Sequence, residues 1–280
     1  MNGCGIIYVA TRHDLFLEEA VISADSVKQL SNTFHITLFT DRPQHPLCGL
    51  GVFDHVETVE SMDVAGSWPS GLLNKVKSLA QSPYDHTLYL DTDTTVLTSE
   101  LSLLFGLADS FDVGMAEALV DDSFSRKYFA RPLFNTGVIL YRKNSRTIGW
   151  LAEWTARSER NCRITRQVPL PPTPELRHVA DPRLRRKLLG NDQISLAPLL
   201  SPEINRCGLR VVTLDYSWNH RGSTLLERNR SPIRIRHWPR ESKEVQAQNL
   251  STAIHRASMQ AGSGDGMHDL FVSENDLKPG

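Results

Sequence analysis

The sequence predicts an α/β protein in which helices cover a mixed, mainly parallel sheet. Two observations favour this class. β-prone runs alternate with stretches of helical periodicity along the first hundred residues, which is the pattern of consecutive βα units. In addition, the run over residues 86–90 is mainly apolar and then stops at Asp91 and Asp93, as a strand does when both its faces are buried and it delivers polar groups to the edge of a sheet.

Composition indicates an ordinary globular protein. The 280 residues suffice for one large α/β domain, and 40% hydrophobic with 22% charged residues supply a sizeable core. A formal net charge of −1 shows no basic bias, so we expect no nucleic-acid partner. Four scattered cysteines without disulfide or metal spacing indicate reduced thiols. We expect one domain over residues 1–260 and a flexible tail rich in Gly, Ser and Asp over residues 261–280.

The sequence also predicts where the protein works. It begins in a strand-like segment rather than a basic and then apolar leader, and no stretch of about 18 residues is apolar enough to cross a membrane. We therefore expect a cytoplasmic protein without a transmembrane segment. Peripheral contact with a membrane stays open, because a helix on a lipid surface need not be strongly apolar.

The N-terminal third contains the elements predicted to precede Asp91 and Asp93, here called the acidic pair. Strands are indicated by short runs of β-branched and aromatic residues, and helices by apolar positions three and four apart. The second helix has Ser70 as its candidate N-cap. The predicted strands cover residues 4–10, 35–40 and 52–59, and the predicted helices residues 14–27 and 69–81.

The same patterns continue beyond the acidic pair. Residues 121–131 are polar and predict a loop. Further strands are predicted at residues 111–117, 132–141, 209–214 and 232–237, and further helices at residues 101–107, 145–160, 194–200 and 245–259.

The segment over residues 162–187 is the least regular part of the sequence. Its five prolines predict that no regular element forms there. It also carries a basic cluster, which would suit either an anionic acceptor or a diphosphate, although a solvated face is the favoured interpretation. The cluster consists of Arg183, Arg185, Arg186 and Lys187.

Asp91 and Asp93 are the first candidate site residues. Carboxylate oxygens suit Mg²⁺ or Mn²⁺, and these ions keep positions open for the phosphates of a nucleotide. Because parallel strands end at one rim, the end of the first strand should lie nearby, with Tyr8, Ala10 and Thr11 placed to bind a nucleoside. An isolated Asp-x-Asp is more often a plain turn.

Three further polar features interrupt apolar patterns. Asn135 and Gly137 lie within the run 132–141, where a β-bulge is the alternative explanation. Residues 190–193 (Gly-Asn-Asp-Gln) precede a helix, where an ordinary N-cap is the alternative. His237 ends a strand-like run, in the same kind of position as Asp91.

Taken in order, these motifs resemble those of the GT-A glycosyltransferases, in particular the glycogenin-like and galactosyltransferase-like group of family 8. The resemblance extends over about residues 4–245 and implies a Rossmann-like GT-A domain. It is carried by Ile6–Thr11, Lys75, Asp91-Thr-Asp93, Phe134-Asn-Thr-Gly-Val138, Gly190-Asn-Asp-Gln193, and His237 with Lys243.

The resemblance implies a metal-dependent transfer of a sugar from a UDP-sugar to an acceptor, with retention of configuration. Asp91, Asp93 and His237 would hold Mn²⁺ or Mg²⁺. Donor contacts would come from Lys75, Thr92 and Lys243, and catalytic contacts to the sugar from Asn135, Asp192 and Gln193. The late motif His237-Trp-Pro-Arg-Glu-Ser-Lys243 departs from the family pattern, which has a glycine three residues after the histidine, so Arg240 is a candidate to share the phosphate contact.

Two other functions stay open at this point. Asp91-Thr-Asp93-Thr-Thr also fits the motif of haloacid-dehalogenase-like phosphatases, in which Asp91 would be a nucleophile, although such enzymes carry it on their first strand. A sugar-nucleotide-binding protein without activity is the third possibility. The acceptor is not indicated, and a glycan, a lipid-linked sugar, a protein and a small molecule all stay open.

Overall fold

The structure is a computed structural model that describes residues 3–31, 33–60, 68–118, 133–201, 205–221, 232–237 and 243–260. The side chains of residues 68–70, 175, 243 and 244 are outside the description. The predicted loop 121–131 and the predicted tail 261–280 also lie outside these ranges. Within the described ranges, no helix combines the length and the apolar character that a membrane span requires.

A seven-stranded mixed sheet forms the centre of the molecule, in the order β3-β2-β1-β4-β7-β6-β8. The first four strands of this order run parallel, and β7 lies antiparallel between β4 and β6. The last strand, β8, pairs parallel with β6. The mainly parallel sheet predicted from the sequence is therefore confirmed. The bounds are β1 Cys4–Ala10, β2 His35–Thr40, β3 His55–Thr58, β4 His86–Leu90, β6 Val113–Glu117, β7 Phe134–Arg142 and β8 Val211–Leu214.

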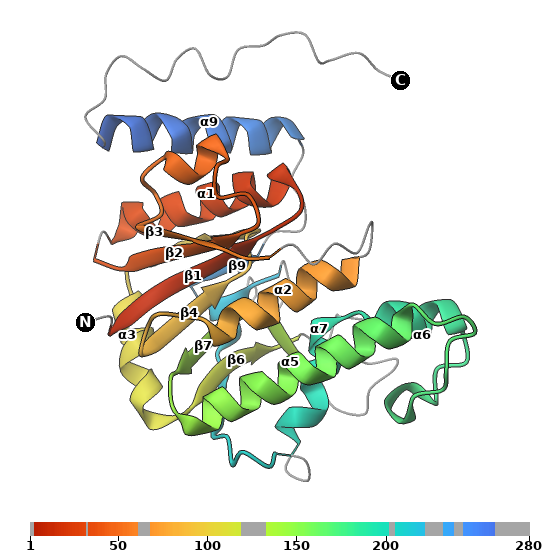
Figure 1. Ribbon diagram of the computed structural model, residues 1–280. Helices are drawn as coiled ribbons and strands as arrows, with labels where there is room; N and C mark the ends of the chain where they lie inside the picture. The colour runs from red at the N-terminus through yellow and green to blue at the C-terminus, as the bar shows by residue number, and fades with distance from the viewer. Residues whose placement is uncertain are drawn as a thin grey trace, which may run out of the picture.

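Helices cover both faces of the sheet (Figure 1). On one face α1 (Asp14–Leu30) lies against the strands and α9 (Lys243–Gln260) lies outside α1. On the other face lie α2 (Trp68–Ala80) and α5 (Ser145–Thr165). Alternation along β1 serves both cores: Ile6 and Tyr8 pack toward α1, whereas Ile7 packs with the tryptophans of α5.

Shorter elements complete the fold. The remaining α-helices are α3 (Leu101–Leu107), α6 (Pro182–Leu189) and α7 (Asp192–Leu196). Short 3₁₀ turns lie at Pro46–Gly49, Ala108–Ser110, Pro174–Leu176, Ala197–Leu200 and Tyr216–Asn219. Strand β5 (Thr94–Val96) is not part of the central sheet. It pairs antiparallel with β9 (Ile235–His237) in a separate two-stranded ribbon.

Two local predictions were wrong. Helix α2 begins at Trp68, so Ser70 lies in its first turn and is not its N-cap. Residues 162–187 do contain regular structure, because α5 continues to Thr165 and α6 starts at Pro182. Proline is compatible with the first helical position, where its missing N–H has no intrahelical role, and Asp181 caps the helix by accepting from the Arg183 N–H.

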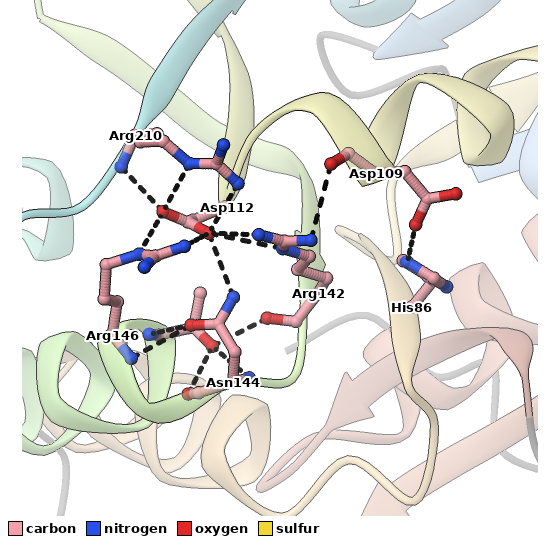
Figure 2. A network of polar contacts seen from close by, with 8 residues as sticks. His86, Asp109, Asp112, Arg142, Asn144, Arg146 and Arg210 are labelled. Atoms are coloured by element: carbon pink, nitrogen blue, oxygen red, sulfur yellow. Dashed lines mark hydrogen bonds and ion pairs between the residues drawn. The ribbon is translucent and has the colours of Figure 1, made fainter.

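A buried carboxylate ties together the sheet end that lies away from the acidic pair (Figure 2). Asp112, just before β6, is fully buried. It accepts hydrogen bonds from Arg142 at the end of β7, from Arg146 and Asn144 at the start of α5, and from Arg210 just before β8, at 2.7–3.4 Å. One carboxylate therefore fixes three strand ends and a helix start.

Candidate active site

Asp91, Asp93 and His237 meet at the carboxyl end of β4. The His237 Nε2 atom lies 3.1 Å from Asp93 Oδ1 and 3.8 Å from Asp91 Oδ2, and one ligand atom from each of the three residues lies within 4.8 Å of the others. The ribbon causes this convergence, because His237 pairs directly with Thr94, the residue after Asp93. Two carboxylates and an imidazole at this spacing form a set of ligands that suits a divalent cation.

Gly137 provides the space in which this group fits. A Cβ atom at position 137 would lie 2.3 Å from His237 Cε1 and 2.9 Å from Asp91 Oδ2, closer than real contacts allow. The Gly137 carbonyl also accepts a 2.7 Å hydrogen bond from the Asp91 N–H. The close backbone approach expected at Gly137 is thus present. The register of β6 and β7 also shifts here, so the β-bulge given as the alternative explanation is present.

Two buried asparagines orient the histidine. His237 Nδ1 lies 3.0 Å from Asn219 Oδ1, which can only accept, so Nδ1 carries a proton and Nε2 is the ring nitrogen that faces the carboxylates. Asn219 Nδ2 donates to Asn135 Oδ1 at 2.8 Å, and the Gly137 N–H donates to the same oxygen at 2.8 Å. Asn219 was not predicted, since its partner is distant in sequence and no local pattern marks it.

Lys75 joins the acidic pair to Asp192. Its Nζ atom lies 2.9 Å from Asp91 Oδ1 and 3.0 Å from Asp192 Oδ2, and the side chain is almost fully buried. Burial lowers the pKa of the Lys75 ammonium, but Asp192 and Asp91 outweigh burial and raise that pKa, so Lys75 stays charged. Tyr89 donates a short hydrogen bond to the same Asp91 oxygen, which leaves Oδ2 of Asp91 on the side of His237.

Asp192 lies at the start of α7 with both oxygens engaged. Its Oδ2 atom also accepts from Thr136 Oγ1 at 2.7 Å, and its Oδ1 atom accepts from the Gln193 N–H at 3.0 Å. Asn191 caps the helix through the Gln193 and Ile194 N–H groups, so the predicted helix start is confirmed. This arrangement fixes Asp192 as the partner of Lys75, and it places Gln193 one residue further along the same helix.

Asp93 is held in its charged form. Burial raises the pKa of Asp93, but the hydrogen bond and charge of His237 outweigh burial and lower that pKa.

Asn135 contributes a free donor, because its Nδ2 atom is buried without a hydrogen-bond partner in the described structure. Buried polar atoms normally have a partner, so a bound ligand is a candidate acceptor for this N–H group.

The residues that the sequence predicts to bind a nucleoside are placed differently from one another. Ala10 ends β1, which pairs with β4, and Thr11 follows directly; both side chains are buried. Tyr8 is fully buried in the core on the α1 side, and its hydroxyl is linked through Ser23 to Thr94 beneath the Asp-x-Asp turn. The structure therefore does not present the Tyr8 side chain at the surface of the site.

Thr92 and Lys243 are the last two residues that the sequence predicts to contact the donor. Thr92 donates to Glu19 at 2.9 Å, so its side chain is tied to α1. Lys243 begins α9, and its side chain, like the whole of Arg240, lies outside the described residues. The structure thus brings together the six residues Lys75, Asp91, Asp93, Asn135, Asp192 and His237.

Comparison with known proteins identifies the architecture. No family model and no curated protein matches the sequence. Among solved structures, the chain is similar to the galactosyltransferase LgtC in complex with donor and acceptor sugar analogues, at 16% identity and a TM-score of 0.55, over 95% of this chain and 98% of that one. It is also similar to the glycosyltransferase GlyE of Streptococcus pneumoniae TIGR4, at 14% identity and 0.53, over 92% and 64% of the two chains.

A third similar structure is the bifunctional glycosyltransferase WbbM, at 13% identity and a TM-score of 0.51, over 92% of this chain and 52% of that one. At such identities the similarity concerns the fold. The chain therefore has the GT-A fold of these glycosyltransferases, and the fold predicted from the sequence is confirmed.

Proposed function

We propose that the protein is a metal-dependent glycosyltransferase that moves a sugar from a UDP-sugar to an acceptor with retention of anomeric configuration. The observation that carries the proposal is the convergence of Asp91, Asp93 and His237 at the carboxyl end of β4 in a GT-A fold. Parallel strands end at this rim, which is where α/β sheets bind their ligands. The cytoplasmic location expected from the sequence belongs to the same proposal.

The three side chains fit a divalent cation. Two carboxylates and one neutral imidazole nitrogen suit Mn²⁺ or Mg²⁺, and Asn219 already fixes the tautomer that leaves Nε2 free for a metal. Asp91, Asp93 and His237 would hold the ion. When bound, it supplies Lewis-acid stabilisation of the negative charge that develops on the departing diphosphate.

The chain's own residues prepare the site for this reaction. Lys75 places one positive charge between Asp91 and Asp192, which reduces the repulsion of these carboxylates for each other and for the incoming diphosphate. The free Nδ2 of Asn135 would donate to a hydroxyl of the donor sugar. Ala10, Thr11 and Thr92 would contact the nucleoside through the rim on which they lie. Lys243 would neutralise the phosphates.

Gln193 is the remaining catalytic candidate. It follows Asp192 at the beginning of α7, and its side chain forms no hydrogen bond with the described residues. An amide at this place would orient the sugar as positive charge develops at its anomeric carbon. Asp192 is paired with Lys75 and Thr136. This pairing favours a role in which Asp192 positions Lys75 over one in which the carboxylate attacks the sugar.

Calorimetric titration with UDP in the presence and absence of Mn²⁺ tests the proposal. We expect UDP to bind only with Mn²⁺, and His237→Ala to weaken this binding about tenfold or more. His55→Ala is the matched control, since His55 is half exposed on β3 and pairs with Glu57. UDP binding that is unaffected by Mn²⁺ would refute the metal-dependent transferase.

The two alternative functions predict different results. The phosphatase hypothesis predicts metal-dependent release of phosphate from an aryl phosphate, blocked by Asp91→Asn, and it gives no role to His237. A binding protein without activity would bind UDP with Mn²⁺ but would not release UDP from UDP-glucose or UDP-galactose when acceptors are supplied. Measuring phosphate release, UDP binding and UDP release on one preparation separates the three hypotheses.

A further inference from the structure

A basic surface borders the candidate active site. Seven arginine and lysine residues occur between residues 163 and 187 against only two acidic residues, Glu175 and Asp181, although the whole chain has a formal net charge of −1. The segment therefore carries positive charge that the rest of the chain does not share. The seven residues, here called the basic surface, are Arg163, Arg166, Arg177, Arg183, Arg185, Arg186 and Lys187.

This surface belongs to a folded unit that is joined to the site. Helix α6 buries Leu188 and Leu189 in a small apolar cluster with Leu176 and Ile194. Ile194 is two residues from Asp192, and Figure 1 shows α6 next to α7 at the end of α5. This packing fixes the apolar side of α6 against the protein. The basic side chains therefore lie on the outer side of the helix, near the sheet edge that carries Asp192.

The positive charges are not neutralised by described neighbours. Arginines elsewhere in the chain pair with carboxylates, as Arg146 does with Asp112 and Arg256 with Asp25. Within the described ranges, none of the seven side chains of the basic surface forms such a pair. The Nε atom of Arg185 is moreover buried without a hydrogen-bond partner among these residues. Unpaired guanidinium groups favour carboxylate or phosphate ligands, which they bind through two parallel hydrogen bonds.

We propose that the basic surface binds an anionic acceptor, a saccharide that carries carboxylate or phosphate groups, and so selects the acceptor class of the enzyme. This inference rests on the proposed transferase function. A water-exposed saccharide fits better than a lipid bilayer, because Leu188 and Leu189 of α6 are buried and the partly buried Leu184 packs against the same apolar cluster, so α6 presents no free apolar face to a membrane. The large exposed apolar side chain in the segment is Val168, a single valine, which is ordinary on a protein surface.

The test compares saccharides that differ only in charge. Tetragalacturonate and its neutral methyl ester, and maltotetraose with and without a terminal phosphate, are titrated into the full chain saturated with Mn²⁺ and UDP. We expect at least one anionic member to bind about tenfold tighter than its neutral partner, with the preference falling as salt is raised. Arg183→Gln with Lys187→Gln should remove most of the preference and leave UDP affinity unchanged, because both residues are exposed and lie on the outer side of α6.

A matched variant loses the same charge elsewhere. Arg206→Gln with Lys143→Gln removes two exposed positive charges away from α6 and should keep the preference. Equal affinity for both members of each pair, including no measurable binding of either, would overturn the proposal, as would an unchanged preference in the α6 variant. Binding to vesicles with 30% phosphatidylglycerol but to no anionic saccharide would replace it with a membrane surface. Loss of Mn²⁺-dependent UDP binding would instead count against the transferase itself.

Discussion

At the scale of single residues, the site depends on two residues that touch neither substrate nor metal in any proposed role. Asn219 holds the ring of His237, and Gly137 leaves the space that the ring and Asp91 occupy. Both act by fixing the position of His237, whose Nε2 atom must face the carboxylates if the three residues are to share an ion.

Substituting Asn219 should remove the hydrogen bond that orients the ring of His237. We expect Asn219→Ala to weaken Mn²⁺ binding about ten- to hundredfold, because the ring loses the acceptor that fixes its tautomer. Asn219→Asp keeps an oxygen acceptor for Nδ1 but loses the hydrogen bond to Asn135, so it should recover part of the affinity that Asn219→Ala loses, which a merely structural defect would not allow. Electron paramagnetic resonance of free Mn²⁺ measures both variants, and equal dissociation constants for wild type and Asn219→Ala would contradict this role.

Adding a methyl group at Gly137 should push the ligands apart. In Gly137→Ala the new Cβ would meet His237 Cε1 at 2.3 Å, so we expect Mn²⁺-dependent UDP affinity to fall about tenfold or more. Gly106→Ala in α3 is the control, since its Cβ would have no atom within 4 Å. Calorimetry with UDP and Mn²⁺ makes the comparison, and similar affinities in both variants would show that the site relaxes around the added methyl group.

At the scale of elements, Asp112 connects β6, β7, β8 and α5 (Figure 2). Burial raises the pKa of Asp112, but hydrogen bonds from Arg146, Arg210 and Asn144 outweigh burial and hold that pKa far below its usual range. A carboxyl group whose pKa is lowered by folding stabilises the protein above the unfolded-state pKa of about 3.9. This contribution is lost as the pH falls toward the folded-state pKa.

The corresponding prediction concerns acid stability. We expect Asp112→Asn to lower the free energy of unfolding by about 2–4 kcal/mol at pH 7, because the arginines lose their charged partner. The difference from wild type should shrink below about pH 4. Asp109→Asn, at a carboxylate that is 79% exposed, should change little. Urea unfolding at several pH values measures both, and a deficit in Asp112→Asn that stays constant down to pH 3 would contradict the assignment.

Elements also show which features the sequence could predict. The strands of residues 4–10 and 35–40 were correctly placed, since their apolar runs report burial on both faces. The ribbon of β5 and β9 could not be found by periodicity, because pairing between distant three-residue strands leaves no local pattern. His237 was nevertheless identified through the resemblance to a family. Asp112 and Asn219 were missed, because their partners are assigned only by the tertiary fold.

At the scale of the whole molecule, α9 forms an outer layer that covers α1. Ala253 and Ala257 are buried against the core on that face, and Arg256 pairs with Asp25 of α1 at 2.9 Å. The C-terminal helix is thus part of the packed structure. The domain boundary near residue 260 remains a prediction that two truncated chains would test.

A chain that ends at Gln260 should melt within about 2 °C of the full chain. A chain that ends at residue 242 lacks α9, exposes the side of α1 on which α9 packs, and should melt lower by about 5 °C or more. Differential scanning calorimetry on the three chains gives the comparison. A large drop in the melting temperature on removing residues 261–280 alone would show that the domain extends beyond residue 260.

The ribbon of β5 and β9 also sets the order in which the site arises during synthesis. Asp91 and Asp93 are added when about a third of the chain has been made, whereas His237 is added in the last fifth. Until then the nascent strand β5 has no partner, and the two carboxylates lack their third ligand. Capture of a metal ion by all three ligands is therefore a property of the nearly finished polypeptide, and any product of translation that stops before β9 lacks the complete set.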